Sequence, residues 1–259
     1  MSALYTFDGT AYRPGPLCVG PWSPDAQHGG PVSALLAGAV EAAVDPRFDH
    51  IPVQVVRVTV ELLRPVPLSP LTVTSAVVRP GRNVQVAEAT MHAGDHEVAR
   101  ARALRIRRTS LDVPVVRAEP PAPVPPADPS ASSVARRTAF AEAVDLRFIK
   151  GSWDDPGPVT MWSRLIVPVV EGREPSPLQR AVAAADFGNG VSRVLEFDHH
   201  MFINPDLTVA LARVPEGEWV GFDVVSRLST EGFGQAESAI FDAVGPVGRS
   251  VQSLLVSER

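Results

Sequence analysis

The chain has 259 residues, of which 45% are hydrophobic and 20% charged, and its formal net charge is −5. This composition is typical of a folded globular protein and excludes a disordered or fibrous chain. The negative charge argues against nucleic acid or an anionic membrane as a partner, and no stretch reaches the roughly 20 apolar residues of a membrane helix.

The N-terminal segment contains the one cysteine, Cys18, which excludes an intramolecular disulfide and a thiolate-rich metal site. We expect Cys18 to be a small buried apolar residue. The first residues show no basic region followed by an apolar run, so we predict no secretory signal and a cytoplasmic location.

The first half of the chain reads as one helix followed by four strands. Gly29–Val44 is rich in alanine and leucine and apolar nearly all round, which favours a helix buried against a sheet. The strands alternate apolar and polar residues and are separated by proline, glycine and asparagine turns. Their predicted ranges are 53–64, 71–79, 84–93 and 97–107.

Five arginines crowd into the last of these strands and the residues just after it. Alternation places Arg100 and Arg102 on one face of the strand, either as a solvated face or as an anchor for the phosphates of a nucleotide-bearing substrate. The five are Arg100, Arg102, Arg105, Arg107 and Arg108.

A proline-rich segment then separates the first half from a second series of elements. Residues 111–130 hold seven prolines, which predicts an extended, semi-rigid linker. The expected second series is lead-in strands at 143–148 and 160–168, a helix at 175–187, and strands at 202–213, 218–227, 233–242 and 246–256.

The two halves match without a gap at a constant offset of 149 residues. An ungapped register that also preserves the strand pattern indicates an internal duplication. Its clearest identities pair Thr59 with Thr208, Val60 with Val209, Leu62 with Leu211 and Arg64 with Arg213.

Each copy therefore predicts a curled antiparallel sheet wrapped around one apolar helix, which is the hotdog fold. Two copies in one chain make an α+β double hotdog whose sheets join edge to edge. We divide the chain into an N-terminal hotdog at 1–110, a linker at 111–135 and a C-terminal hotdog at 136–259.

The copies differ at three positions, where apolar residues of the first are answered by polar residues of the second. Asp186 aligns with Ala37, Asn204 with Val55, and Gln252 with Ala103. Each residue also has an ordinary structural interpretation. Asp186 would be a solvent-exposed helix end, Asn204 a turn asparagine and Gln252 a solvent-facing strand glutamine. Together they suggest one constellation that activates water: the aspartate accepts a proton, and the amides orient the water and steady the oxyanion.

The chain also resembles the double-hotdog acyl-CoA thioesterases of the TesB-like type II family. The resemblance rests on ordered motifs: Gln27 to Leu36 with its Gly-Gly helix start, Leu63 to Pro67, Arg79 to Arg82, Ala185-Asp186, Phe202 to Thr208, Gly217 to Trp219, and Ser250 to Gln252.

This resemblance implies hydrolysis of acyl-CoA by a water that an Asp–Thr–Gln trio holds in the second hotdog. The aspartate falls on Asp186 and the glutamine on Gln252, whereas Asn204 occupies the threonine position. We expect substrate contacts at the helix start and the arginine turn, and a cytoplasmic homo-oligomer, a dimer of double hotdogs, without cofactor or metal. The substrate-binding residues would be His28, Gly29, Gly30 and Arg82.

Two other functions fit the same fold. The asparagine at the threonine position is compatible with an acyl-CoA-binding or scaffolding protein that hydrolyses little. A hotdog hydratase or dehydratase would use an Asp/His pair, for which Asp198 and His200 can share one strand face. A metal site of Asp198, His200 and Asp206 is possible on residue type but lacks a recognised spacing.

Overall fold

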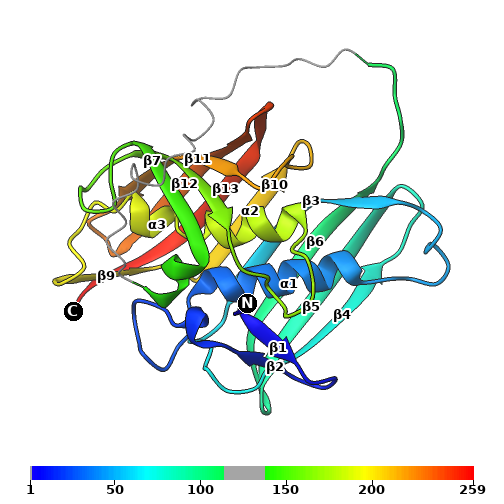
Figure 1. Cartoon of the computed structure of the whole chain (residues 1–259), viewed down its shortest axis with the longest axis horizontal. Coiled ribbons are helices and arrows are strands. Elements are labelled where there is room, and N and C mark those ends of the chain that lie inside the picture. Colours follow the sequence, from blue (N-terminus) through cyan, green and yellow to red (C-terminus); the bar gives the residue numbers. More distant parts are fainter. Residues whose placement is uncertain (1, 114–137) are drawn as a thin grey trace.

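The computed structural model describes residues 2–113 and 138–259. Within them, helices lie on one face of a long antiparallel sheet, and both copies contribute strands to it (Figure 1). The architecture is the predicted α+β double hotdog. Most of the linker expected at 111–135 falls at 114–137, outside the described residues, so the domain boundaries stay predictions.

The first copy closely follows the sequence prediction. Helix α1 runs from Gly29 to Ala42 and is buried along most of its length. The strands that curl around it are β3 (Val53–Leu62), β4 (Thr72–Arg79), β5 (Val84–Ala93) and β6 (His96–Arg107). A short hairpin of β1 (Tyr5–Phe7) and β2 (Tyr12–Pro14), not predicted, precedes the helix, followed by the 3-10 turn η1 (Pro16–Cys18).

The second copy repeats this plan with one longer lead-in hairpin. After a 3-10 turn, η3 (Ala139–Ala143), β7 (Val144–Lys150) pairs with β8 (Val159–Leu165). The meander then consists of β9 (His200–Ile203), β10 (Asp206–Leu211), β11 (Val220–Leu228), β12 (Phe233–Asp242) and β13 (Gly245–Glu258).

The two sheets join through their β3 and β10 edges, as expected. The strand order is β4-β5-β6-β3-β10-β13-β12-β11-β8-β7, so each copy covers the other's open edge. Thr59 lies directly opposite Thr208 in this pairing, and their hydroxyl oxygens are 3.0 Å apart. These residues are equivalent at the offset of 149, so a pseudo-twofold axis passes between them.

The helices show where the copies diverge. Residues 29–42 form one continuous helix, whereas the equivalent residues form α2 (Pro177–Ala185) and the short α3 (Gly188–Val191), with a break at Asp186 and Phe187. The predicted single helix at 175–187 therefore ends two residues early. α1 and α2 pack against each other (Figure 1), and Gly30 permits this because a Cβ there would lie 2.9 Å from the carbonyl oxygen of Ala183 on α2.

Three side chains of the arginine cluster form local ion pairs or hydrogen bonds. Arg100 pairs with Glu97 at 2.8 Å and Arg102 with Glu88 at 2.9 Å, on the solvated face of β6. Arg105 is buried and donates to the carbonyl of Ala43 at the end of α1, where it satisfies a free helix carbonyl. The strand therefore has a solvated arginine face and one arginine that caps α1.

Two further observations concern Cys18 and the helices. Cys18 is fully buried, as expected, and its thiol contacts the carbonyl of Leu4 at 3.1 Å. Burial raises the pKa of this thiol to about 12, so it stays protonated at neutral pH.

Across residues 2–113 and 138–259, every helix is too short or too polar to cross a membrane.

Candidate active site

Asp186 lies at the break between α2 and α3, where it is the C-terminal cap of α2. It does end a helix, but it is only 2% exposed, so the solvent-exposed alternative is wrong. A buried carboxylate needs hydrogen-bond partners to offset its loss of hydration. Asp186 has such partners from both copies of the hotdog.

The first partner is His28, the residue that precedes α1 in the other copy. Its Nδ1 lies 2.8 Å from Oδ2 of Asp186, and the imidazole is 10% exposed. The same Nδ1 lies 3.1 Å from the backbone nitrogen of Gly30. One ring nitrogen cannot donate and accept at once, and the shorter, charge-assisted contact assigns the Nδ1 proton to the bond with Asp186.

Aromatic side chains hold the imidazole in place. The ring centroids of Phe140 and Phe187 are 4.9 and 5.1 Å from that of His28, and the two phenyl rings stack on each other. From the sequence, His28 was expected only as a substrate contact at the helix start. Its contact with Asp186 joins residues on different copies, so no local spacing signalled it.

Asn204 lies in the two-residue break between β9 and β10, beside the end of β3 at Leu62, whose backbone nitrogen donates to the carbonyl of Pro205. The amide nitrogen of Asn204 donates to Oδ1 of Asp186 at 2.8 Å and to the carbonyl of Asp206 at 3.3 Å. Both amide protons therefore have acceptors, which leaves the side-chain carbonyl to face a ligand. The break between β9 and β10 thus places the Asn204 side chain next to Asp186, as the comparison of the two copies suggested.

Gln252 approaches Asp186 from β13, deeper in the protein. Its nitrogen donates to the backbone carbonyl of Asp186 at 3.3 Å and lies 3.5 Å from Oδ1, while its oxygen accepts from the backbone of Asn189 at 3.1 Å. Gln252 is 2% exposed, so the solvent-facing alternative is wrong. Its amide bridges the ends of α2 and α3 and fixes the carboxylate between them.

The residues of the first copy that are equivalent to Asp186, Asn204 and Gln252 are apolar. Ala37, Val55 and Ala103 are buried there among apolar neighbours, and the position that corresponds to His28 is Pro177. The polar constellation around Asp186 therefore belongs to the second copy, and it faces the N-terminus of α1.

A cavity of about 690 Å³ opens beside this constellation. Asp186, Asn204, His28 and Gly29 line it, whereas Gln252 does not. Much of the remaining wall is apolar. These apolar lining residues include Trp22, Val32, Leu62, Trp153, Phe187 and Ile203.

Gly29 makes the close approach of α1 and Asp186 possible. A Cβ at this position would lie 2.7 Å from both carboxylate oxygens, closer than atoms can pack. Glycine is therefore required where the helix start meets the carboxylate.

Besides Gln252, two predicted residues lie outside this cavity lining. Gly30 lies one residue deeper in α1 and packs against Phe140, with its backbone nitrogen near His28. Arg82 is exposed in the turn between β4 and β5. This turn lies at the far end of the sheet from Leu62, which lines the cavity. The structure does not bring Arg82 to Asp186.

The residues of the alternative Asp/His pair do not both line the cavity. Asp198 lines the cavity, whereas His200 pairs with Glu258 at the edge of the sheet and does not line it. In the part of the chain that the structure describes, no cluster of three or more histidine, cysteine or acidic residues is placed to hold a metal.

The fold and this site define a double hotdog with one buried carboxylate at the junction of its copies. Two family models match the sequence: the acyl-CoA thioesterase N-terminal domain at residues 19–106 and the acyl-CoA thioesterase C-terminal domain at residues 117–256. The chain therefore belongs to the TesB-like acyl-CoA thioesterase family, which supports thioester hydrolysis in general terms. A search of curated proteins gave no match.

Solved structures share the fold over almost the whole chain. A conserved protein of unknown function with a hot dog fold from Alicyclobacillus acidocaldarius has a TM-score of 0.74 and 18% identity, covering 98% of this chain and 95% of its own. The TesB protein of Mycobacterium avium subsp. paratuberculosis has a TM-score of 0.67 and 17% identity, covering 98% and 95%. Acyl-CoA thioesterase II TesB2 from Mycobacterium marinum has a TM-score of 0.63 and 17% identity, covering 94% and 96%.

Proposed function

We propose that this protein hydrolyses acyl-CoA thioesters with a water molecule that Asp186 activates. The observation that carries the proposal is a carboxylate 2% exposed that still lines a largely apolar cavity. Asp186 takes a proton from water as the water oxygen attacks the thioester carbonyl. The tetrahedral intermediate then breaks its C–S bond, and the proton passes to the departing CoA sulfur.

The polar neighbours divide the remaining tasks. His28 donates Nδ1–H to Asp186 and keeps the carboxylate oriented. Asn204 donates to the other carboxylate oxygen, and its carbonyl accepts a hydrogen bond from the attacking water. Gln252 is a positioning residue, because both ends of its amide are engaged with the α2–α3 junction.

The start of α1 supplies electrostatic stabilisation. The first N–H groups of a helix lack partners within the helix and carry its partial positive charge. Gly29 lines the cavity beside Asp186, so these groups suit a thioester oxygen that becomes negative in the transition state. The apolar wall would hold the acyl chain.

An acyl-CoA panel tests this function. We expect thiol release from acyl-CoAs of at least one chain length, detected with a thiol reagent as free CoA forms. Tight binding without turnover at every chain length would instead support the acyl-CoA-binding alternative, which the occupied amide protons of Asn204 favour. The predicted dimer of double hotdogs and the cytoplasmic location remain proposals, and light scattering on purified protein tests the first.

A further inference from the structure

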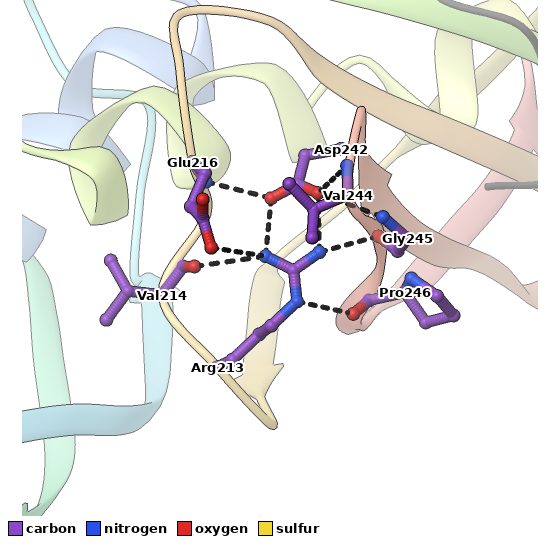
Figure 2. A network of polar contacts seen from close by, with 7 residues as sticks. All are labelled: Arg213, Val214, Glu216, Asp242, Val244, Gly245 and Pro246. Atoms are coloured by element: carbon purple, nitrogen blue, oxygen red, sulfur yellow. Dashed lines mark hydrogen bonds and ion pairs between the residues drawn. The ribbon is translucent and has the colours of Figure 1, made fainter. Parts of the chain in front are cut away.

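Arg213 follows β10 and is tied into a dense polar network (Figure 2). Its guanidinium donates to both carboxylate oxygens of Asp242 and to the carbonyls of Gly245 and Pro246. Asp242 is fully buried. Burial alone would raise the pKa of Asp242, but hydrogen bonds from Arg213 and from the backbone of Glu216 and Val244 outweigh it and lower the pKa. Arg213 therefore has a structural role.

The equivalent arginine of the first copy, Arg64, lacks the acidic partners that hold Arg213. At the offset of 149, Asp242 corresponds to Ala93 and Glu216 to Pro67, so both acidic partners are missing. Across residues 2–113 and 138–259, Arg64 has no ion-pair or hydrogen-bond partner. An exposed arginine without a partner is free to bind an anion.

Arg64 also lies where an anion of the substrate would be. It follows β3 and lines the same cavity as Asp186. Arg259 lines it too, with its guanidinium 5.5 Å from the ring centroid of Trp22, and Asp198 is an exposed carboxylate on the same wall. Arg100 and Arg102, in contrast, are paired with glutamates.

We propose that Arg64 binds a phosphate group of the coenzyme A part of the substrate. This inference rests on the proposed function, because a CoA thioester carries phosphates on its nucleotide and an apolar chain on its acyl end. The apolar wall excludes the phosphates from the inner cavity, so they remain at its solvent-exposed rim. A guanidinium there binds a phosphate through charge-assisted, bidentate hydrogen bonds.

Calorimetry with free CoA and with pantetheine, which lacks the phosphates, tests this site without requiring turnover. We expect the wild type to bind CoA more tightly than pantetheine. Arg64→Ala should weaken CoA binding about tenfold, the scale of one charge-assisted hydrogen bond, and leave pantetheine binding unchanged. Arg57→Ala is the matched control, because Arg57 is an exposed arginine on β3 outside the cavity lining; it should change neither affinity.

Each outcome decides between the two proposals. If Arg64→Ala leaves CoA binding unchanged, or weakens CoA and pantetheine equally, the phosphate site is wrong even if the enzyme hydrolyses acyl-CoA. If the CoA affinity depends on Arg64 but no acyl-CoA is hydrolysed, the phosphate site stands and the proposed hydrolysis fails. A wild type that binds no CoA contradicts the phosphate site, whereas the acyl-CoA panel decides the hydrolysis separately.

Discussion

Replacing Gly29 with alanine should lower activity in a protein that stays folded. The added Cβ would lie 2.7 Å from both oxygens of Asp186, whereas ordinary contacts begin at about 3.4 Å. The carboxylate or the helix start must therefore move by about 0.7 Å, the difference between these distances. A displacement of this size at a reacting group lowers the rate about tenfold to a hundredfold. The overpacking should lower stability by about 1–3 kcal/mol, which leaves the protein folded at the assay temperature.

The assay compares kcat for acyl-CoA hydrolysis with the melting temperature of the same preparation. Gly38→Ala is the matched control on α1, because a Cβ there displaces the amide of Gln179, which is bonded to Ser176 and to the carbonyl of Ala34, in a clash away from the cavity. It should keep kcat close to wild type. A Gly29→Ala variant that keeps wild-type kcat would refute the placement of the reacting carboxylate against the helix start.

Other predictions concern stability and reactivity. Asp242→Asn should lower the free energy of unfolding by about 2–3 kcal/mol, because it breaks a pair whose acid is fully buried while Arg213 is 30% exposed. Glu237→Gln, in the exposed pair with Arg227, should cost less than about 1 kcal/mol in the same denaturant titration. The pKa of Asp242 is lowered on folding, so its stabilisation is present above its unfolded value and is lost as the pH falls through the folded value; a wild type and an Asp242→Asn variant with identical acid unfolding would contradict this. Cys18 should resist alkylation in the native protein at pH 8 and react only after unfolding; rapid native labelling would show that the thiol is accessible.

The sequence predicts most of the fold because the two copies constrain each other. The ranges 84–93 and 233–242 coincide with β5 and β12, and the opposed Thr59 and Thr208 confirm the offset. Alternation and turn residues are local signals, so strands are recovered to within a few residues. The break of the helix at Asp186 was not predicted, because it depends on Gln252, which holds the ends of α2 and α3 from a distant strand.

The candidate site was only partly accessible from sequence. Comparing the copies located Asp186, Asn204 and Gln252, since polar residues replace apolar ones at those positions. It could not find the contact of His28 with Asp186, because that contact crosses between copies and His28 aligns with Pro177. The comparison of the copies also gave no reason to prefer Arg64 to Arg82, because only the structure shows that Arg64 lines the cavity and that Arg213 depends on Asp242, which aligns with Ala93.

The central claim is that a single carboxylate, Asp186, activates water in the second copy. The most direct test is kcat of Asp186→Asn for acyl-CoA hydrolysis, since asparagine preserves the shape but cannot take a proton. With folding verified by circular dichroism, we predict a loss of about a hundredfold to ten-thousandfold, the usual contribution of a general base. A folded Asp186→Asn protein that hydrolyses acyl-CoA at the wild-type rate would contradict the assignment.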